Sequence, residues 1–139
     1  ALKKGDYIRS FGYVKVLKEG KEFYFATTHL DHKYEDAARL LQINEILSHV
    51  EQLDLPVILG GDLNSRRGSA TMEAFQRYFT VNCLSDGAPW TVPAPNPTYA
   101  CDWLIYAPNK AFVVKAYNVC YWADKESDHF PVTATYVIR

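Results

Sequence analysis

The chain consists of apolar, strand-like segments that run into short polar motifs, and this arrangement constrains its fold and chemistry more than any other feature. The four motifs are Thr28-His29-Leu30-Asp31, Gly61-Asp62-Leu63-Asn64-Ser65, Cys101-Asp102-Trp103-Leu104-Ile105 and Ser127-Asp128-His129-Phe130-Pro131. Each motif places His, Asp or Asn side chains at the end of a predicted strand. Acids, bases and hydrogen-bond donors in this order predict an enzyme.

The length of the chain predicts one compact domain, because 139 residues suffice for a single hydrophobic core. No apolar run approaches the roughly 18 to 20 residues that span a bilayer, and no charged-then-apolar leader opens the sequence. The first five residues are typical of a start within a fold, so a leader could lie upstream. The sequence therefore leaves the cellular compartment open.

The charge of the chain disfavours a broad cationic surface for duplex DNA, because the formal net charge is −1. An anionic substrate would need local contacts instead. Arg66, which with Arg67 directly follows Asn64, and Trp90, in a proline-rich segment, are the candidate substrate contacts. Adjacent arginines in a loop are also common as solvated surface.

The three cysteines, Cys83, Cys101 and Cys120, cannot all pair with one another and show no CxxC spacing. This pattern predicts neither a disulfide framework nor a zinc knuckle. Buried thiols are the expected state.

A β-hairpin is predicted at the start of the chain. Residues 7–17 alternate in the manner of a strand, residues 18–21 supply a turn with a glycine, and residues 22–28 form an aromatic and β-branched strand. The hairpin would deliver His29 at the far end of its second strand. His29 then lies at the same sheet edge as Asp62 if the two strands are parallel neighbours.

The middle of the chain predicts a helix, a buried strand and a second helix. Apolar residues recur at helical spacing over 35–53, Pro56 ends that helix, and residues 57–59 form an apolar run typical of a strand covered on both faces. Ser69 is the expected cap of a short second helix. Residues 86–98 contain four prolines, so a loop without strand pairing is expected there.

The remaining segments, 99–106, 112–119 and 130–138, read as three further strands. The order is then strands, helix, strand, helix, strands, with no internal repeat and no linker that would divide the chain.

Asp62 and Asn64 suit the hydrolysis of a phosphate ester. Such a reaction needs a base that activates water and donors for the charge that grows on the non-bridging oxygens. Asp62 can orient and deprotonate water, and the Asn64 amide points the same way if the stretch is extended. The same residues are also ordinary turn formers.

The Asp128-His129 pair is a stronger indication, since an adjacent acid and imidazole point to opposite faces of a strand and the acid can bind a divalent metal. His129 needs a partner for its ring, and Asp102 would be costly to bury without a partner. An Asp102–His129 pair satisfies both. The alternatives are a loop aspartate and a half-buried structural histidine, and His29 is equally open to a structural interpretation.

A zinc site at His29, Asp31 and His32 is the alternative metal site, and the sequence disfavours it. The HxHxDH arrangement of zinc-binding hydrolases is absent, and His49 falls within the predicted helix.

Taken together and in this order, the four motifs resemble the endonuclease/exonuclease/phosphatase superfamily, which has the deoxyribonuclease I-like fold. The resemblance runs from about Ile8 to the C-terminus through TTHLDH, VILGGDLNS, CDWLIY and SDHFPVTATYVI. It implies an α/β fold in which a mixed sheet is backed by helices. This arrangement is equivalent to the C-terminal half of a four-layer α/β/β/α sandwich.

The resemblance also implies a function, the divalent-metal-dependent hydrolysis of a phosphoester or phosphodiester. In the roles it implies, Asp62 activates water, His29 and Asn64 contact the phosphate, His129 oriented by Asp102 stabilises the pentavalent state, and Asp128 helps to hold Mg²⁺ or Mn²⁺.

The sequence departs from the family pattern in one respect. The family's metal-binding glutamate and an asparagine come from the half of the fold that precedes this sequence. Residues 1–139 are therefore expected to be the C-terminal part of a single domain whose N-terminal half is absent. Asp128 alone is a thin cage for Mg²⁺, so we expect weak metal affinity and little or no activity from this chain alone.

Two further expectations follow. An inner sheet face without its cover predicts self-association. The competing functional hypotheses are a binding module that keeps the fold without turnover, and a nuclease rather than a phosphatase or small-molecule phosphodiesterase. A binding module has no need of the full set of polar residues. The presence of all six therefore disfavours it: His29, Asp62, Asn64, Asp102, Asp128 and His129.

Overall fold

The computed structural model describes residues 1–2, 7–33, 35–81 and 89–139. The elements, in chain order, are β1 (Phe11–Lys18), β2 (Lys21–Thr28), α1 (Ala37–Val50), β3 (Val57–Asp62), α2 (Ala70–Gln76), β4 (Thr80–Val81), β5 (Asp102–Ala107), the 3₁₀ turn η1 (Asn109–Ala111), β6 (Phe112–Val119) and β7 (Val132–Ile138). None of the helices in these residues is long and apolar enough to cross a membrane.

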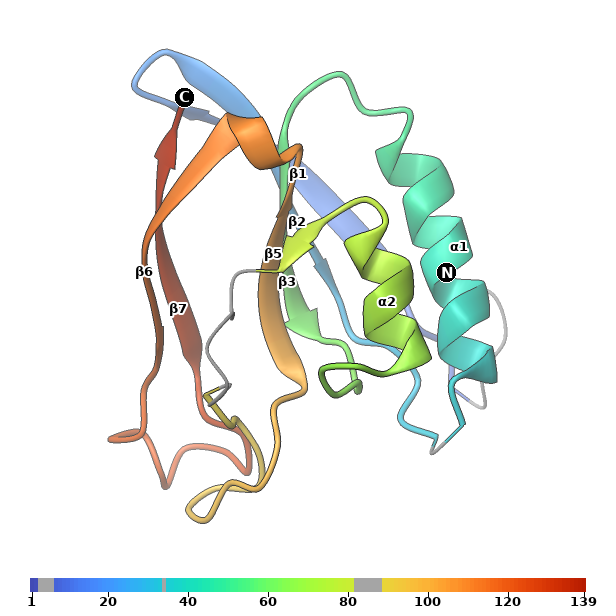
Figure 1. Cartoon of the computed structure of the whole chain (residues 1–139), viewed down its shortest axis with the longest axis vertical. Coiled ribbons are helices and arrows are strands. Elements are labelled where there is room, and N and C mark those ends of the chain that lie inside the picture. The colour runs from blue at the N-terminus through green and yellow to red at the C-terminus, as the bar shows by residue number, and fades with distance from the viewer. Residues whose placement is uncertain (3–6, 34, 82–88) are drawn as a thin grey trace.

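The strands form two sheets, and the helices lie on one side only. The larger sheet has the order β1-β2-β3-β5-β4, in which β2 and β3 are parallel and the other pairs antiparallel. Helices α1 and α2 cover one face of this sheet, and the β6–β7 hairpin lies across the opposite face (Figure 1). The chain is thus α/β with a mixed sheet backed by helices, as the sequence predicts.

The predicted N-terminal hairpin is confirmed, although its first strand begins at Phe11 rather than at Tyr7. Strand β1 pairs with β2 in a register that runs from Phe11 opposite Thr28 to Lys18 opposite Lys21. The two-residue turn places both Glu19 and Gly20 at positive φ, which matches the twist of a hairpin. The parallel pairing of β2 with β3 then brings the ends of these two strands to the same edge of the sheet.

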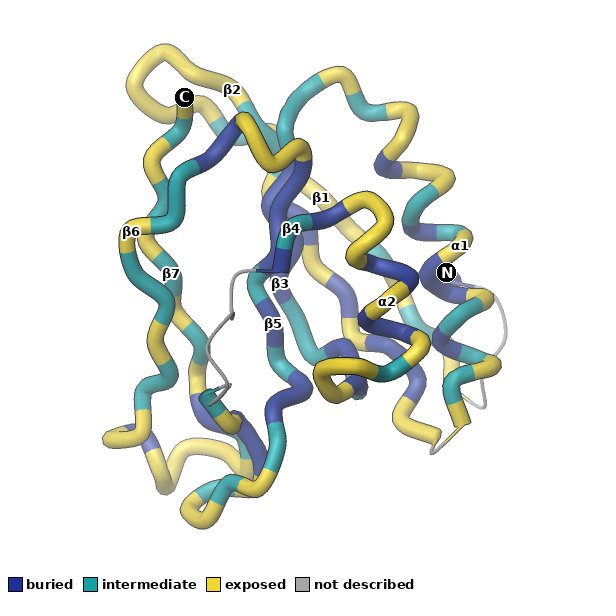
Figure 2. Tube along the Cα trace, in the orientation of Figure 1, coloured by how far each residue is buried: buried dark blue, intermediate teal, exposed yellow. Residues whose placement is uncertain are grey.

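The larger of two cores lies between the sheet and the helices. Residues that alternate along the central strands point toward α1 and α2, including Leu59 on β3 and Ile105 on β5, both fully buried. The intervening residues point to the β6–β7 side, where Ile58, Tyr106 and Phe112 form a smaller apolar cluster. Figure 2 shows that the central strands are mostly buried, whereas the β6–β7 hairpin is partly exposed.

The structure differs from the predicted secondary structure in the proline-rich loop and at β4. The proline-rich loop does contain strand pairing, because Val92 and Tyr99 form an antiparallel bridge. The short strand β4 was not predicted, since a two-residue strand has no period of its own. Cys83 and the first residues of the predicted loop, 86–88, lie outside the described residues.

The β6–β7 hairpin covers the inner face of the large sheet only in part. Val14 on β1 is 61% exposed, and its cross-strand partner Phe25 on β2 is 41% exposed. The apolar surface expected on this face therefore remains at its β1–β2 side.

Gly61 allows the end of β3 to approach the end of β2. Its φ is +157°, and an added Cβ would lie 1.9 Å from the carbonyl oxygen of Thr28. We expect Gly61→Ala to lower the free energy of unfolding by about 3 kcal/mol, because the backbone must move to relieve the overlap. Urea denaturation measures the loss. Gly12→Ala is the matched control, since nothing lies within 4 Å of its added Cβ, and an equal loss in both variants would contradict the explanation.

Candidate active site

Two carboxylates stand side by side on the inner face of the large sheet. Asp62 ends β3, Asp102 begins β5, and the antiparallel register places these residues directly opposite each other. Directly paired residues project to the same face of a sheet. Their side chains are 16% and 19% exposed, so both acids are largely removed from water yet open on one side.

His129 pairs with Asp102, as the sequence predicts. Its Nδ1 lies 2.9 Å from Asp102 Oδ2. An ionised carboxylate only accepts hydrogen bonds, so Nδ1 carries the proton and Nε2 is the nitrogen left for a substrate. The pairing fixes the ring orientation and favours its charged form.

Asp102 is itself held by two side chains to which the sequence assigned no role in the site. The buried Thr91 hydroxyl donates to Asp102 Oδ2 at 2.6 Å, and the Cys101 thiol donates to the same oxygen at 3.5 Å. The Thr91 hydroxyl in turn accepts from the Cys101 backbone N–H at 3.2 Å. Thr91 therefore positions the acid that orients His129.

The proline-rich loop also positions the His129 segment through the backbone. Phe130 N–H donates to the Thr91 carbonyl at 2.8 Å, and Ala94 N–H donates to the Asp128 carbonyl at 2.8 Å. These two bonds lie on either side of His129. The loop thus serves as a scaffold for the imidazole, although its composition suggested only a connection.

His29 lies beside Asp62, at the sheet edge where the parallel strands predict it. Its Nε2 is 3.3 Å from Asp62 Oδ2, and its side chain is half-exposed. The segment after it is anchored to α1, because the buried Arg39 donates to the Asp31 carbonyl at 3.0 Å and Asp31 N–H donates to the Gln42 side chain at 2.9 Å. Helix α1 therefore helps to hold His29 in place.

Asn64 departs from the extended geometry expected of it. Strand β3 ends at Asp62, and Asn64 has a φ of +46°. Its backbone N–H donates to Asp62 Oδ1 at 2.8 Å, and its amide Nδ2 donates to the Leu30 carbonyl at 2.9 Å. The residue is brought to the site by a tight turn, in which it also orients the Asp62 carboxylate.

An open cavity of about 450 Å³ lies on the inner face of the large sheet, and neither His29 nor Asn64 is among its lining residues. Asp62, Asp102 and His129 line it on the polar side, and apolar lining comes from Phe25, Leu104 and others. A hydrophobic cavity with a few convergent polar groups is the usual form of a ligand site.

The charges of the site act on two of its groups. Burial lowers the pKa of His129, but the hydrogen bond and charge of Asp102, with the charges of Asp62 and Asp128, outweigh it and raise that pKa overall. Burial and the two adjacent carboxylates raise the pKa of the Cys101 thiol far above its usual range. The imidazole is thus biased toward its charged form and the thiol toward its neutral form.

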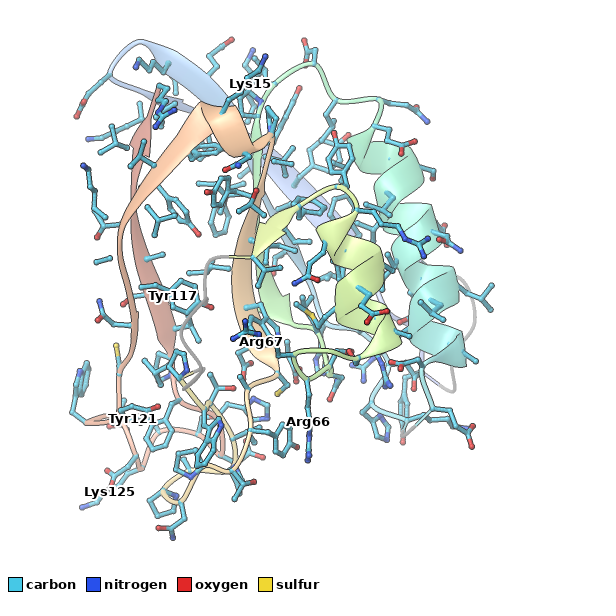
Figure 3. The ribbon with its side chains drawn as sticks, viewed as in Figure 1. Lys15, Arg66, Arg67, Tyr117, Tyr121 and Lys125 are labelled. Carbon is cyan, nitrogen blue, oxygen red and sulfur yellow. The ribbon has the colours of Figure 1, made fainter. Side chains whose placement is uncertain are left out.

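The other predicted site residues lie around this centre. Arg66 stacks over the Tyr99 ring, with its Cζ 4.1 Å from the ring centroid, and Figure 3 shows it extending from the loop end of the molecule. Trp90 is half-exposed, and its carbonyl accepts from the Tyr121 hydroxyl at 3.1 Å. Asp128 is exposed, with its carboxylate 3.4 Å from the Ser127 hydroxyl.

A group able to hold a metal ion forms within the described residues. Asp62, Cys101, Asp102 and His129 each offer one ligand atom, and these atoms all lie within 4.8 Å of one another. The group includes neither Asp128 nor the His29, Asp31 and His32 set that was disfavoured from the sequence. Sequence reasoning missed Cys101 as a member, although it adjoins Asp102, because a buried apolar role was expected for it.

Comparison with solved structures shows what this fold is. A mannosyl-6-phosphatase of Bacteroides thetaiotaomicron is 25% identical, with a TM-score of 0.74 over 94% of this chain. An endonuclease/exonuclease/phosphatase of Beutenbergia cavernae gives a TM-score of 0.76 at 22% identity over 96% of this chain, and the human Nocturnin catalytic domain with bound sulfate gives 0.74 at 18% over 94%.

Sequence comparison adds a shorter match. Sphingomyelinase C 1 of Leptospira interrogans is 37% identical over 73 residues, which cover 45% of this chain and 12% of that protein. No protein-family model matches the chain. The chain spans 57% of the length of the Bacteroides phosphatase, 40% of the Beutenbergia protein and 52% of the Nocturnin domain.

Proposed function

The chain has the endonuclease/exonuclease/phosphatase fold, as its four motifs predict, and from this premise we propose that it contributes the catalytic groups of a phosphoester hydrolase. The observation that carries the proposal is the convergence of Asp62, Asp102 and His129 on one cavity from three segments of the chain. A stable fold has no need of two adjacent carboxylates at an open cavity.

Asp62 is the proposed base. Its Oδ1 is oriented by the Asn64 N–H, and its Oδ2 faces His29 Nε2 at 3.3 Å, so the carboxylate is held in one orientation beside the cavity. A carboxylate in this position can take a proton from water as the water attacks phosphorus. His29 and Asn64 are the proposed contacts to the phosphoryl oxygens, with Arg66 and Trp90 as outer contacts to the substrate.

His129 is the proposed donor to the phosphoryl group. Asp102 accepts from Nδ1 and supports the charged ring, so Nε2 can donate to an oxygen that gains negative charge in the transition state. Asp102 is a positioning residue in this scheme, and Thr91 supports it.

The fold family also implies Mg²⁺ or Mn²⁺. Mg²⁺ is held in proteins by one or two carboxylates together with waters and substrate phosphates. The exposed Asp128 carboxylate can supply one of these ligands. When bound, such an ion would supply positive charge near the phosphoryl and leaving oxygens. Asp128 is the residue of this chain that we propose to hold it.

We further propose that residues 1–139 are the C-terminal part of one such domain, whose activity requires the part that precedes them. The proposal is supported by the coverage, since 94% of this chain aligns with 57% of the Bacteroides phosphatase. The full-length protein should release phosphate or cleave a phosphodiester in Mg²⁺ when offered nucleic acids, phospholipids and sugar phosphates in turn. Binding of these ligands without turnover in the full-length protein would favour a non-catalytic binding module.

Self-association of the isolated chain is the expected consequence of its exposed inner face. Val14 and Phe25 lie opposite each other there and expose apolar surface that a second copy can cover. We expect the sedimentation coefficient to rise with concentration, and Val14→Lys to abolish the rise. Leu41→Lys is the matched control, because Leu41 is 53% exposed on α1, on the other side of the sheet. A single monomeric species at high concentration contradicts the proposal.

A further inference from the structure

We propose that Asp62, Cys101, Asp102 and His129 form a binding site for Zn²⁺, and that zinc bound there prevents catalysis. The site shares Asp62, Asp102 and His129 with the proposed hydrolase, but it also needs the Cys101 thiol, and it uses Nδ1 of His129 rather than the Nε2 that would donate to the phosphoryl group. Binding of zinc is independent of the proposed function, whereas the inhibition that it would cause rests on that function.

The spacing of the donor atoms carries the proposal. Cys101 Sγ lies 3.5 Å from Asp102 Oδ2 and 3.9 Å from His129 Nδ1, and Nδ1 lies 2.9 Å from Oδ2. In a tetrahedral zinc site, bond lengths of about 2.0 to 2.3 Å separate neighbouring ligand atoms by roughly 3.3 to 3.6 Å. Shifts of a few tenths of an ångström would therefore place these three atoms around one ion. The nearby Asp62 carboxylate supplies a fourth ligand atom.

The kind of donor selects the metal. Mg²⁺ prefers oxygen ligands, whereas thiolate and imidazole favour Zn²⁺. A coordinating thiol gives up its proton. Zinc would therefore displace one proton from Cys101 Sγ and one from His129 Nδ1, and both protons would pass to solvent. The imidazole can then carry its remaining proton on Nε2.

The surroundings of the group suit an ion. Cys101 is 2% exposed, whereas Asp62, Asp102 and His129 line the open cavity, so an ion can enter from that side and reach the thiol. The Thr91 hydroxyl already orients the Asp102 carboxylate, in the manner of the hydrogen bonds that orient metal ligands. An ion held here would replace the Asp102–His129 hydrogen bond, because Oδ2 and Nδ1 would bind the ion instead of each other.

Zinc affinity tests the binding directly, by competition with a chromophoric chelator and without any measurement of activity. We expect Cys101→Ser to weaken zinc binding by at least about tenfold. Loss of a residue that only hydrogen-bonds to a metal ligand already costs about tenfold in affinity, and Cys101 is a proposed ligand itself. Cys120→Ser is the matched control and should leave the affinity unchanged, because Cys120 is not a member of the group. His129→Gln is a second variant, expected to weaken binding to a similar degree.

Co²⁺ gives an independent readout, since a thiolate ligand produces a charge-transfer absorption band. The band should be present in the unmodified chain and in Cys120→Ser, and absent in Cys101→Ser. Equal zinc affinity in the unmodified chain and Cys101→Ser, or failure of the chain to bind zinc, would overturn the site. In the full-length protein, zinc bound through Cys101 that leaves phosphate release unchanged would overturn the inhibitory consequence.

Discussion

Asp62→Asn in the full-length protein should lower kcat by about 10³-fold, within the range typical of a general base. Asparagine has the shape of aspartate, and its carbonyl oxygen can still accept from the Asn64 N–H. The variant therefore removes the basic group and the negative charge while it keeps the turn that orients the side chain. Steady-state kinetics on the best substrate of the panel measures the loss.

Asp124→Asn is the matched control for this variant, since Asp124 is an exposed aspartate outside the site. It should retain the activity of the unmodified protein. Circular dichroism and the Tm should show that both variants are folded. Full activity in a folded Asp62→Asn variant would remove Asp62 from the mechanism and with it the proposed water activation.

His129→Asn should lower kcat by about 10²-fold to 10³-fold, because it removes the proton donor that Asp102 orients. The effect should fall on kcat more than on KM, since the proposed contact strengthens as charge grows on the phosphoryl oxygens. His49→Asn is the matched control, because His49 is exposed on α1. A change confined to KM would assign His129 to substrate binding instead.

Asp102→Asn tests whether this acid acts through His129. Groups that act as a unit give strongly non-additive losses, so the double variant should be only slightly less active than His129→Asn alone. The downfield proton resonance of the Nδ1 hydrogen bond should also be lost in Asp102→Asn. Losses that multiply in the double variant would show that Asp102 has a role separate from His129.

Much of the fold follows from local patterns in the sequence. Alternation predicts the β1–β2 hairpin, helical spacing predicts α1, and Ser69 caps α2, where its side chain accepts from the Met72 N–H. These elements are set by residues close in the chain, so their signal is local. The proximity of His29 and Asp62 required one further assumption, the parallel pairing of β2 and β3, which the structure confirms.

The Asp102–His129 pair was predictable for another reason. An acid within an apolar strand needs a partner, and His129 needs a partner for its ring, so one pair satisfies both. The support that Thr91 gives to this pair was not predictable, because it depends on the fold of a proline-rich loop over β5. The left-handed conformation of Asn64 was also not predictable. Placing its side chain on the same face as Asp62 assumed that the strand continues past Asp62, whereas β3 ends there.

The proline-rich loop has a consequence for efforts to re-engineer the protein. Loop grafting is a common route to new specificity, and the exposed Trp90 makes this segment an obvious target. Yet Thr91 and Ala94 share backbone hydrogen bonds with the residues on either side of His129, so a foreign loop would also displace the imidazole. Substitutions in the loop at residues 91–94 and substitutions beside His129 should therefore have strongly non-additive effects. Directed evolution of the loop should select them together.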